Sequence, residues 1–300
     1  MRLTPTPVFR FAPSPNGELH LGHALSALTG FQMARAAGGR FLVRIEDIDP
    51  QRTREAFVRQ IFEDLAWLGL HWEEPVMRQS DRFAVYGSAA DALRARGLLY
   101  PCFATRREIE EAVAARPGGV DPDGAPLYPG LSKGMTPEDV AARSARGDPY
   151  CLRIDMGRAV DEVRAILGGA ALDFTELGGD GAMRRVVADP ARWGDAIIVR
   201  KDTPASYHLA VVVDDAAQGV THVTRGQDLF AATDLHRLLQ VLLGLPAPLY
   251  HHHPLLLDGE GRKLSKSARD TSLRQLREAG VNREGVLEMA GIDPDHFAHN

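Results

Sequence analysis

Apolar positions in the first hundred residues follow two periods in turn, which predicts alternating strands and helices. A short apolar run, Val8 to Ala12, is closed by Pro13 and is typical of a strand. Beyond it, Leu21, Leu25 and Leu28 recur on one helical face. The expected elements are strand 8–12, helix 20–38, strand 41–45, helix 53–68 and helix 81–96. Strands that alternate with helices in this way indicate an α/β fold with a parallel, doubly wound sheet.

The pattern changes over residues 101–192, where prolines are frequent and the apolar runs are short. We interpret this stretch as an inserted small α+β domain. Sheet-like runs return at 196–199, 209–213 and 220–224, followed by an amphipathic helix at 228–243 that ends at Gly244. The expected domains are a catalytic domain in two halves, 1–100 and 193–267, the insertion 101–192, and a short C-terminal helical tail, 268–300.

The composition is that of an ordinary globular protein. Of the 300 residues, 44% are hydrophobic, which is enough for a sizeable core. The chain has no apolar stretch long enough to span a membrane and no apolar signal-peptide core at its start. Cys102 and Cys151 form no disulfide framework, and together these observations predict a cytoplasmic location. We also expect a monomer. A net charge of −5 argues against non-specific nucleic-acid binding over the whole surface, although it allows a local basic face.

The segment His20-Leu21-Gly22-His23 follows the first strand and a proline- and glycine-bearing turn, where a helix is expected to begin. A helix N-terminus presents unpaired N–H groups and positive partial charge, which suit an anion. Gly22 permits close approach of a nucleotide, while His20 and His23 lie on one side of the helix, where they could donate to phosphate oxygens. Taken alone, the pattern also fits a pair of surface histidines.

A second candidate segment, Lys263-Leu264-Ser265-Lys266-Ser267, lies in a glycine-bearing loop near the end of the chain. Two of the only four lysines in the chain fall here. Two ammonium groups and two hydroxyls could hold a triphosphate while charge builds on the leaving pyrophosphate. By itself the segment also fits a solvated basic loop. One motif after the first strand and one after the last together indicate an adenylate-forming site.

The two motifs resemble those of the class I aminoacyl-tRNA synthetases, and the segments between them resemble the glutamyl branch. The further matching segments are Arg10 to Gly17, Arg44 to Asp49, Tyr207 to Ala210 with Asp214-Asp215, and Thr224 to Gly226. The resemblance spans about residues 8 to 270 in the same order and implies a Rossmann-type catalytic domain. On this basis we assign ATP binding to Pro13, His20, Gly22, His23, Lys263, Ser265 and Lys266, with His20, His23, Lys263 and Lys266 as the catalytic residues.

The resemblance also places Arg10, Glu46, Tyr207 and Arg225 in an amino-acid pocket, with Ser14 near the α-amino end. Glutamate carries two carboxylates and one ammonium, so two guanidiniums and one carboxylate form a complementary set. Glutamine should be rejected because it would leave a buried arginine unpaired. In the implied reaction, a glutamate carboxylate attacks the α-phosphorus of ATP in line, pyrophosphate leaves, and Mg²⁺ accompanies the ATP.

Few residues follow Ser267, so we expect no anticodon-reading helical domain of the kind found in full glutamyl-tRNA synthetases. A short paralogue family that lacks this domain, the glutamyl-queuosine tRNA(Asp) synthetases, matches best. It implies transfer of glutamate to queuosine in the anticodon loop of tRNA(Asp), with Arg106, Arg107 and Arg116 as candidates for the RNA surface. The alternatives are a truncated glutamyl-tRNA synthetase that charges tRNA(Glu) and a catalytically silent tRNA-binding paralogue.

Four positions in the insertion correspond to the zinc ligands that this family usually carries. They are Cys102, Ala104, Tyr128 and Ser132. One thiolate and one phenol are too few for a tetrahedral structural site, and Cys151 is distant in sequence. We therefore expect no zinc, with packing holding the insertion together instead.

Three adjacent histidines, 251–253, invite a metal interpretation. Neighbouring residues of an extended segment point to opposite faces, so the three cannot easily converge on one ion. We expect a strand near the nucleotide site, with one of the histidines lining it.

Overall fold

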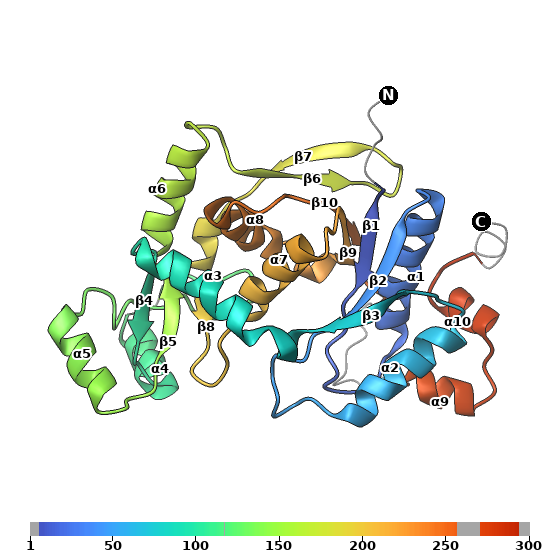
Figure 1. The fold of residues 1–300 in the computed structure, drawn as a ribbon, viewed down its shortest axis with the longest axis horizontal. Helices are drawn as coiled ribbons and strands as arrows, with labels where there is room; N and C mark the ends of the chain where they lie inside the picture. Colours follow the sequence, from blue (N-terminus) through green and yellow to red (C-terminus); the bar gives the residue numbers. More distant parts are fainter. Residues whose placement is uncertain (1–5, 117, 257–270, 294–300) are drawn as a thin grey trace.

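The computed structural model describes residues 6–116, 118–256 and 271–293, and its main feature is a seven-stranded sheet (Figure 1). The strands occur in the order β3 (Glu73–Arg78), β2 (Arg40–Ile45), β1 (Val8–Phe11), β9 (His222–Gly226), β10 (Leu249–His253), β6 (Asp173–Leu177) and β7 (Met183–Val187). All neighbouring pairs are parallel except β6 and β7, which form an antiparallel hairpin. The expected parallel α/β sheet is confirmed.

Helices cover both faces of this sheet, as in a doubly wound fold. The large helices are α1 (Leu21–Ala36), α2 (Glu55–Trp67), α3 (Phe83–Ala95), α7 (Tyr207–Ala217) and α8 (Ala232–Leu243). Successive strand residues point to opposite faces, so Phe9 and Phe11 pack in the core under α1 and α2, while Val8 packs in the core under α7 and α8. Arg10 and Arg44 share the α7 face, which places two cations beside that helix.

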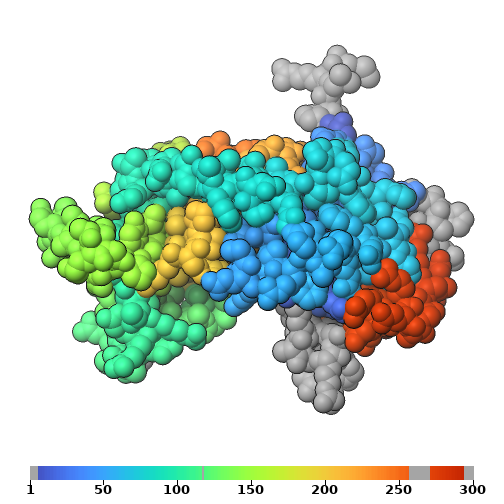
Figure 2. Space-filling model, turned by 60° about the horizontal axis from the view of Figure 1, so that its bottom comes forward, coloured from blue at the N-terminus to red at the C-terminus, as the bar shows by residue number. Residues whose placement is uncertain are grey.

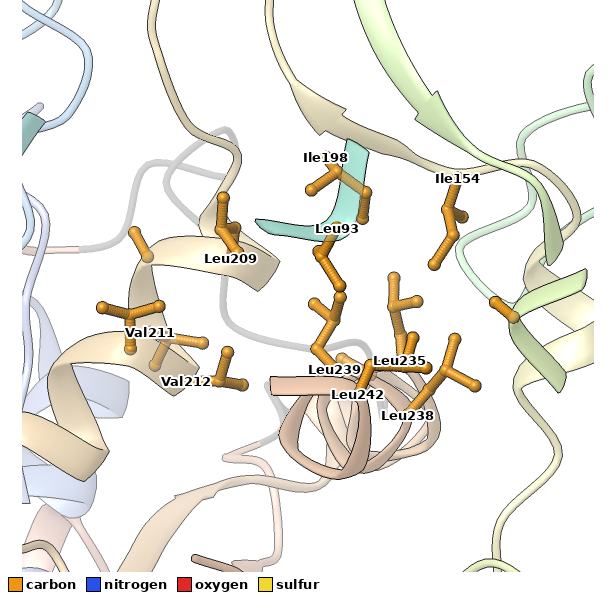
Figure 3. Packing of buried hydrophobic residues seen from close by; sticks show 14 of the residues in the cluster. Leu93, Ile154, Ile198, Leu209, Val211, Val212, Leu235, Leu238, Leu239 and Leu242 are labelled. Carbon is orange, nitrogen blue, oxygen red and sulfur yellow. The ribbon is translucent and has the colours of Figure 1, made fainter. Parts of the chain in front are cut away.

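A smaller antiparallel sheet stands beside the large one. It contains β4 (Leu99–Cys102), β5 (Cys151–Ile154) and β8 (Ile197–Val199), with α4 (Arg106–Ala115), α5 (Pro137–Ala145) and α6 (Met156–Ile166) nearby. Side chains from α3, α7, α8, β5 and β8 meet in one hydrophobic cluster between the two sheets (Figure 3). Leu93, Ile154, Ile198, Leu209 and Leu239 belong to it. The small sheet and the large sheet therefore share a continuous core.

The two ends of the molecule belong to different parts of the chain. In Figure 2, α4 and α5 form a lobe at one end, whereas α9 (Leu273–Glu278) and α10 (Arg283–Met289) lie at the other. α9 packs against α2, and α10 packs against α1. Short 3₁₀ helices occur at η1 (Gln79–Arg82), η2 (Pro190–Trp193) and η3 (Gln227–Leu229). No helix within the described ranges has both the length and the apolar character needed to cross a bilayer.

The strand predicted at 209–213 is wrong, because these residues belong to the helix α7. The side chain of Ser206 accepts a hydrogen bond from the Leu209 N–H and caps the helix. Residues 209–215 are all buried, so the helix is enclosed on every side along this stretch, and the first five of these residues, 209–213, are all apolar. A short, uniformly apolar run of this kind does not distinguish a buried helix from a buried strand.

Other elements are close to expectation or were not foreseen. The helix expected at 228–243 begins later, at Ala232, and ends at Gly244, whose φ of 65° suits glycine. β3 was not foreseen because its sequence is polar and half of it is exposed. Residues 173–187, within the segment expected to form an insertion, extend the large sheet as β6 and β7.

Candidate active site

A cavity of about 510 Å³ lies at the carboxyl ends of β1, β2, β9 and β10, where the N-terminus of α1 meets the sheet. Ligands of open parallel sheets bind at this edge. Nine residues named from the sequence line it: Arg10, Pro13, Ser14, His20, Gly22, His23, Glu46, Tyr207 and Arg225. Residues that are distant in the sequence, such as Arg10 and Arg225, are therefore brought to the same cavity.

His20 and His23 are fixed by the backbone at the start of α1. The Nδ1 atom of His20 accepts from the N–H of Gly22 at 3.1 Å, and the Nδ1 atom of His23 accepts from the N–H of His20 at 3.2 Å. Because Nδ1 is the acceptor in both rings, the proton of each neutral imidazole is on Nε2. A Cβ at Gly22 would lie only 3.0 Å from the His20 ring, so a larger residue here would displace that ring by a few tenths of an ångström.

Arg10 is buried on β1 and is held by helix α7. Its Nε donates to Asp215 Oδ1 at 3.0 Å and its Nη2 to Asp215 Oδ2 at 3.4 Å, while Nη1 donates to the carbonyl of Thr224. A two-pronged contact of this kind fixes the plane of the guanidinium as well as its position. Arg10 is thus oriented by a carboxylate of the protein itself.

Arg44 joins this cluster, although sequence reasoning did not assign it to the site. Its side chain is fully buried and donates to Asp215 at 2.7 Å, to Glu46 at 3.0 Å and to Gln218 at 3.0 Å. Burial by itself would lower the pKa of Arg44, but Asp215, Glu46 and Asp214 together raise it above its usual value. The sequence feature that could have indicated a buried cation is the acid pair 214–215, which follows a strongly apolar segment, because buried acids require buried cations.

Glu46 and Tyr207 also line the cavity. Burial raises the pKa of Glu46, whereas Arg44 and Arg10 oppose that rise. Burial likewise raises the pKa of Tyr207, which therefore keeps its hydroxyl proton. Tyr207 is the first residue of α7, so its position follows from the Ser206 cap.

Arg225, on β9, is held by a different kind of partner. Its Nε donates to His252 Nε2 at 3.1 Å, its Nη1 to His236 Nδ1 at 3.1 Å, and its Nη2 to Thr233 Oγ at 2.6 Å. All three acceptors are neutral groups on β10 and α8. His253, next along β10, lines the cavity and contacts the Ser26 hydroxyl at 2.7 Å, so the expected strand and its lining histidine are both found.

The three other residues assigned to ATP, Lys263, Ser265 and Lys266, lie outside the described residues. Described residues on either side of them lie near the cavity. Leu255 and Leu256 line it, and Ser272 forms a bridge with His20 after the intervening segment.

Three of the four positions corresponding to zinc ligands, Cys102, Tyr128 and Ser132, are joined by hydrogen bonds. Cys102 donates to the Tyr128 hydroxyl at 3.2 Å, and that hydroxyl accepts from the N–H of Ser132 at 2.8 Å. Ala104 is buried and presents no ligand atom in its side chain. Cys151 lies directly opposite Cys102 in the β4–β5 register, so its separation in sequence was no measure of its distance. Within the described ranges, no group of three or more histidine, cysteine or acidic residues is placed to hold a metal.

Arg106 and Arg107, which were named as candidates for an RNA surface, are highly exposed on α4. Each pairs with an acid one helical turn later, Glu110 and Glu111 respectively. Such exposed pairs contribute little to stability, so both guanidiniums can exchange partners easily.

Comparison with known proteins gives a consistent picture across nearly the whole chain. Residues 8–292 match the family described as the catalytic domain of class I tRNA synthetases, E and Q. A Glutamyl-Q tRNA(Asp) synthetase of Rhodobacter capsulatus is 44% identical over 95% of this chain and 100% of its own length.

Longer relatives match over part of their length. A Glutamate--tRNA ligase of Aquifex aeolicus is 37% identical over 93% of this chain but 55% of its own length. The crystal structure of a glutamate tRNA ligase from Elizabethkingia meningosepticum, in complex with its amino acid, superposes with a TM-score of 0.69 at 27% identity. It is matched over 92% of this chain and 53% of its own, so the chain spans about half the length of these ligases.

Proposed function

Because the chain belongs to the class I tRNA synthetases of the E and Q type, we propose that it is a ligase that activates L-glutamate with ATP and transfers the glutamyl group to queuosine in tRNA(Asp). The names of both the shorter and the longer relatives point to glutamate as the substrate. The proposed acceptor, tRNA(Asp), is taken from the name of the shorter relative.

One observation carries the first half of this proposal. A single cavity is lined by Arg10, Arg225, Glu46 and Tyr207 beside a helix N-terminus with two histidines. The arginines and Glu46 complement the two carboxylates and the ammonium of glutamate. The helix N-terminus complements phosphate.

The reaction needs positioning and charge stabilisation rather than a covalent protein intermediate. Glu46 would receive the ammonium and Ser14 would lie near it, while Arg10 and Arg225 would hold the carboxylates. The Nε2–H groups of His20 and His23 would donate to phosphate oxygens, with Gly22 allowing close approach and Pro13 shaping the wall. Mg²⁺ would accompany ATP and neutralise part of its charge.

Lys263, Ser265 and Lys266 would stabilise the pyrophosphate as it leaves. The described residues on either side support this role, because Leu255 and Leu256 line the cavity and Ser272 forms a bridge with His20.

The first experiment is glutamate-dependent ATP–pyrophosphate exchange in the absence of tRNA. Exchange is expected from the wild type, and Lys266→Ala should lower it by about 100-fold or more, as removal of a preorganised charge stabiliser does. Lys133→Ala is the control, since Lys133 pairs with Asp155 and Asp195 in the small-sheet region. Absence of exchange in the wild type would favour a silent tRNA-binding paralogue, and an unchanged rate in Lys266→Ala would remove that residue from the site.

The second experiment concerns the acceptor. Labelled glutamate is offered with tRNA(Asp) containing queuosine, with the same tRNA lacking it, and with tRNA(Glu). Label is expected only on the first, in the anticodon-loop fragment after nuclease digestion. Label on the terminal adenosine of tRNA(Glu) would instead identify a glutamyl-tRNA synthetase activity.

A further inference from the structure

Strand β10 carries His251, His252 and His253, and the proposed reaction gives no role to His252. His252 lies behind Arg225, as seen from the cavity, because Arg225 lines the cavity and His252 does not. His236, on α8, lies behind the same guanidinium. Both histidines are almost fully buried, at 7% and 2% exposed, so neither reaches the substrate directly. Their effect on a ligand must pass through Arg225.

The hydrogen-bond directions in this network follow from the chemistry of arginine. A guanidinium only donates, so His252 Nε2 and His236 Nδ1 must both be acceptors. The remaining proton of His252 is then on Nδ1, where it is donated to Glu176 Oε2 at 2.8 Å. The remaining proton of His236 is on Nε2, facing His208 Nδ1 at 3.2 Å. Burial lowers the pKa of both His252 and His236, which favours the neutral rings that these bonds require.

This arrangement differs from that of Arg10, which also lines the cavity, and from that of Arg44, which bonds the same carboxylate as Arg10. Arg10 is paired with Asp215, and Arg44 is paired with Asp215 and Glu46. Arg225 is fixed at three nitrogens, yet no carboxylate of the described residues contacts it. The acid of its network, Glu176, bonds the far side of His252 instead. A buried guanidinium without a contacting carboxylate is costly until a ligand supplies one.

The two carboxylates of glutamate differ in how they meet such a cation. The α-carboxylate loses its charge when it becomes part of the adenylate anhydride, whereas the side-chain carboxylate stays ionised throughout. An arginine that lacks a carboxylate of its own matches the permanent charge. Glutamine would leave that arginine uncompensated.

We infer that His236 and His252 are positioning residues that hold Arg225 through neutral acceptors, so that its charge is kept for the side-chain carboxylate of the substrate, and that this arrangement sets the preference for glutamate over glutamine. The inference rests on the proposed activation of glutamate and adds the origin of its selectivity.

The test compares two nearly isosteric substitutions of one histidine. His236→Asn keeps a neutral acceptor where Nδ1 stands, and His236→Asp places a carboxylate there, in contact with Arg225. In glutamate-dependent exchange, the aspartate variant should show a KM for glutamate about 10-fold to 100-fold above that of the asparagine variant, with kcat changed little. Its preference for glutamate over glutamine, as a ratio of kcat/KM values, should fall by a similar factor. A purely structural role predicts equal effects, and equal KM values and ratios in the two variants would overturn the inference.

A second pair keeps the question decidable if His236→Asp does not fold. His252→Gln can present a carbonyl oxygen near the position of Nε2, whereas His252→Leu cannot. The leucine variant should lose more glutamate preference than the glutamine variant, and identical preference in the two would count against the positioning role. Calorimetric binding of glutamate separates this result from failure of the proposed function. If the wild type binds glutamate without catalysing exchange, the reaction is wrong, and the same variant pairs are then compared by Kd.

Discussion

Substitution of Arg44 measures how much the buried charge cluster contributes to the free energy of unfolding. Its guanidinium is fully buried and contacts Asp215 at 2.7 Å and Glu46 at 3.0 Å, with Asp214 at 3.9 Å. Arg44→Met retains much of the aliphatic volume but leaves these carboxylates short of a cation. Removing one partner from a buried ion pair costs about 3–5 kcal/mol, because the remaining charge is neither solvated nor paired.

Arg40 provides a matched control on the same strand. It forms an ion pair of 2.6 Å with Glu73, but the two side chains are 47% and 44% exposed. An exposed pair is worth about 0–1 kcal/mol, since water replaces the lost partner. Arg40→Met therefore removes the same chemical group from β2 at little cost.

Thermal unfolding followed by calorimetry distinguishes the two variants. With about 2 °C of melting temperature per kcal/mol for a large domain, Arg44→Met should lower Tm by about 6–10 °C and Arg40→Met by no more than about 2 °C. Comparable losses in the two variants would refute the reasoning, because they would show that burial does not determine the cost.

Three further outcomes are expected. Asp64 is buried, and its carboxylate oxygens lack hydrogen-bond partners. Burial raises the pKa of Asp64 from 3.8 to about 6. The contribution of its neutral form to the stability of the fold is therefore fully present below pH 3.8 and is lost as the pH rises through about 6. Asp64→Asn, which stays neutral, should therefore gain melting temperature over the wild type between about pH 4 and about pH 7.5, and a difference independent of pH would contradict this explanation. Gly22→Ala should raise the KM for ATP by displacing the His20 ring, whereas Gly87→Ala, in open space on α3, should leave KM unchanged and stabilise the helix by about 0.5–1 kcal/mol. Prolonged treatment with a zinc chelator should leave Tm unchanged, because Ala104 and Ser132 supply no thiolate, and a fall would reveal a bound metal.

The parts of the site that could be predicted from sequence are those set by local rules. Val8 to Ala12 was identifiable as a strand from its apolar run, and the helix after His20 from its periodicity. Because strand ends of a parallel sheet meet at one edge, Arg10, Glu46 and Arg225 could be expected near one another, and all three line the cavity. Their assigned roles await the proposed experiments.

The parts that could not be predicted depend on long-range partners. Arg44 bonds Asp215 across 171 positions of sequence, and no local pattern specifies that pairing. His236 on α8 meets Arg225 on β9 only through the tertiary fold, in which α8 packs against α7 and β6. Helix α7 was mistaken for a strand because its apolar residues are buried on all sides, which removes the periodicity that normally identifies a helix.

The β6–β7 hairpin limits how far this protein could be trimmed by an engineer. Residues 101–192 look like a removable module in the sequence, yet β6 pairs with β10 and supplies Glu176 to His252. Excising the whole range would leave β10 as a bare sheet edge, which is a template for self-association. Ending the deletion before Asp173 would keep this hairpin but would still remove Leu152 and Ile154 of β5 from the hydrophobic core that the two sheets share. The boundary of a removable module therefore follows neighbours in the fold rather than neighbours in the chain.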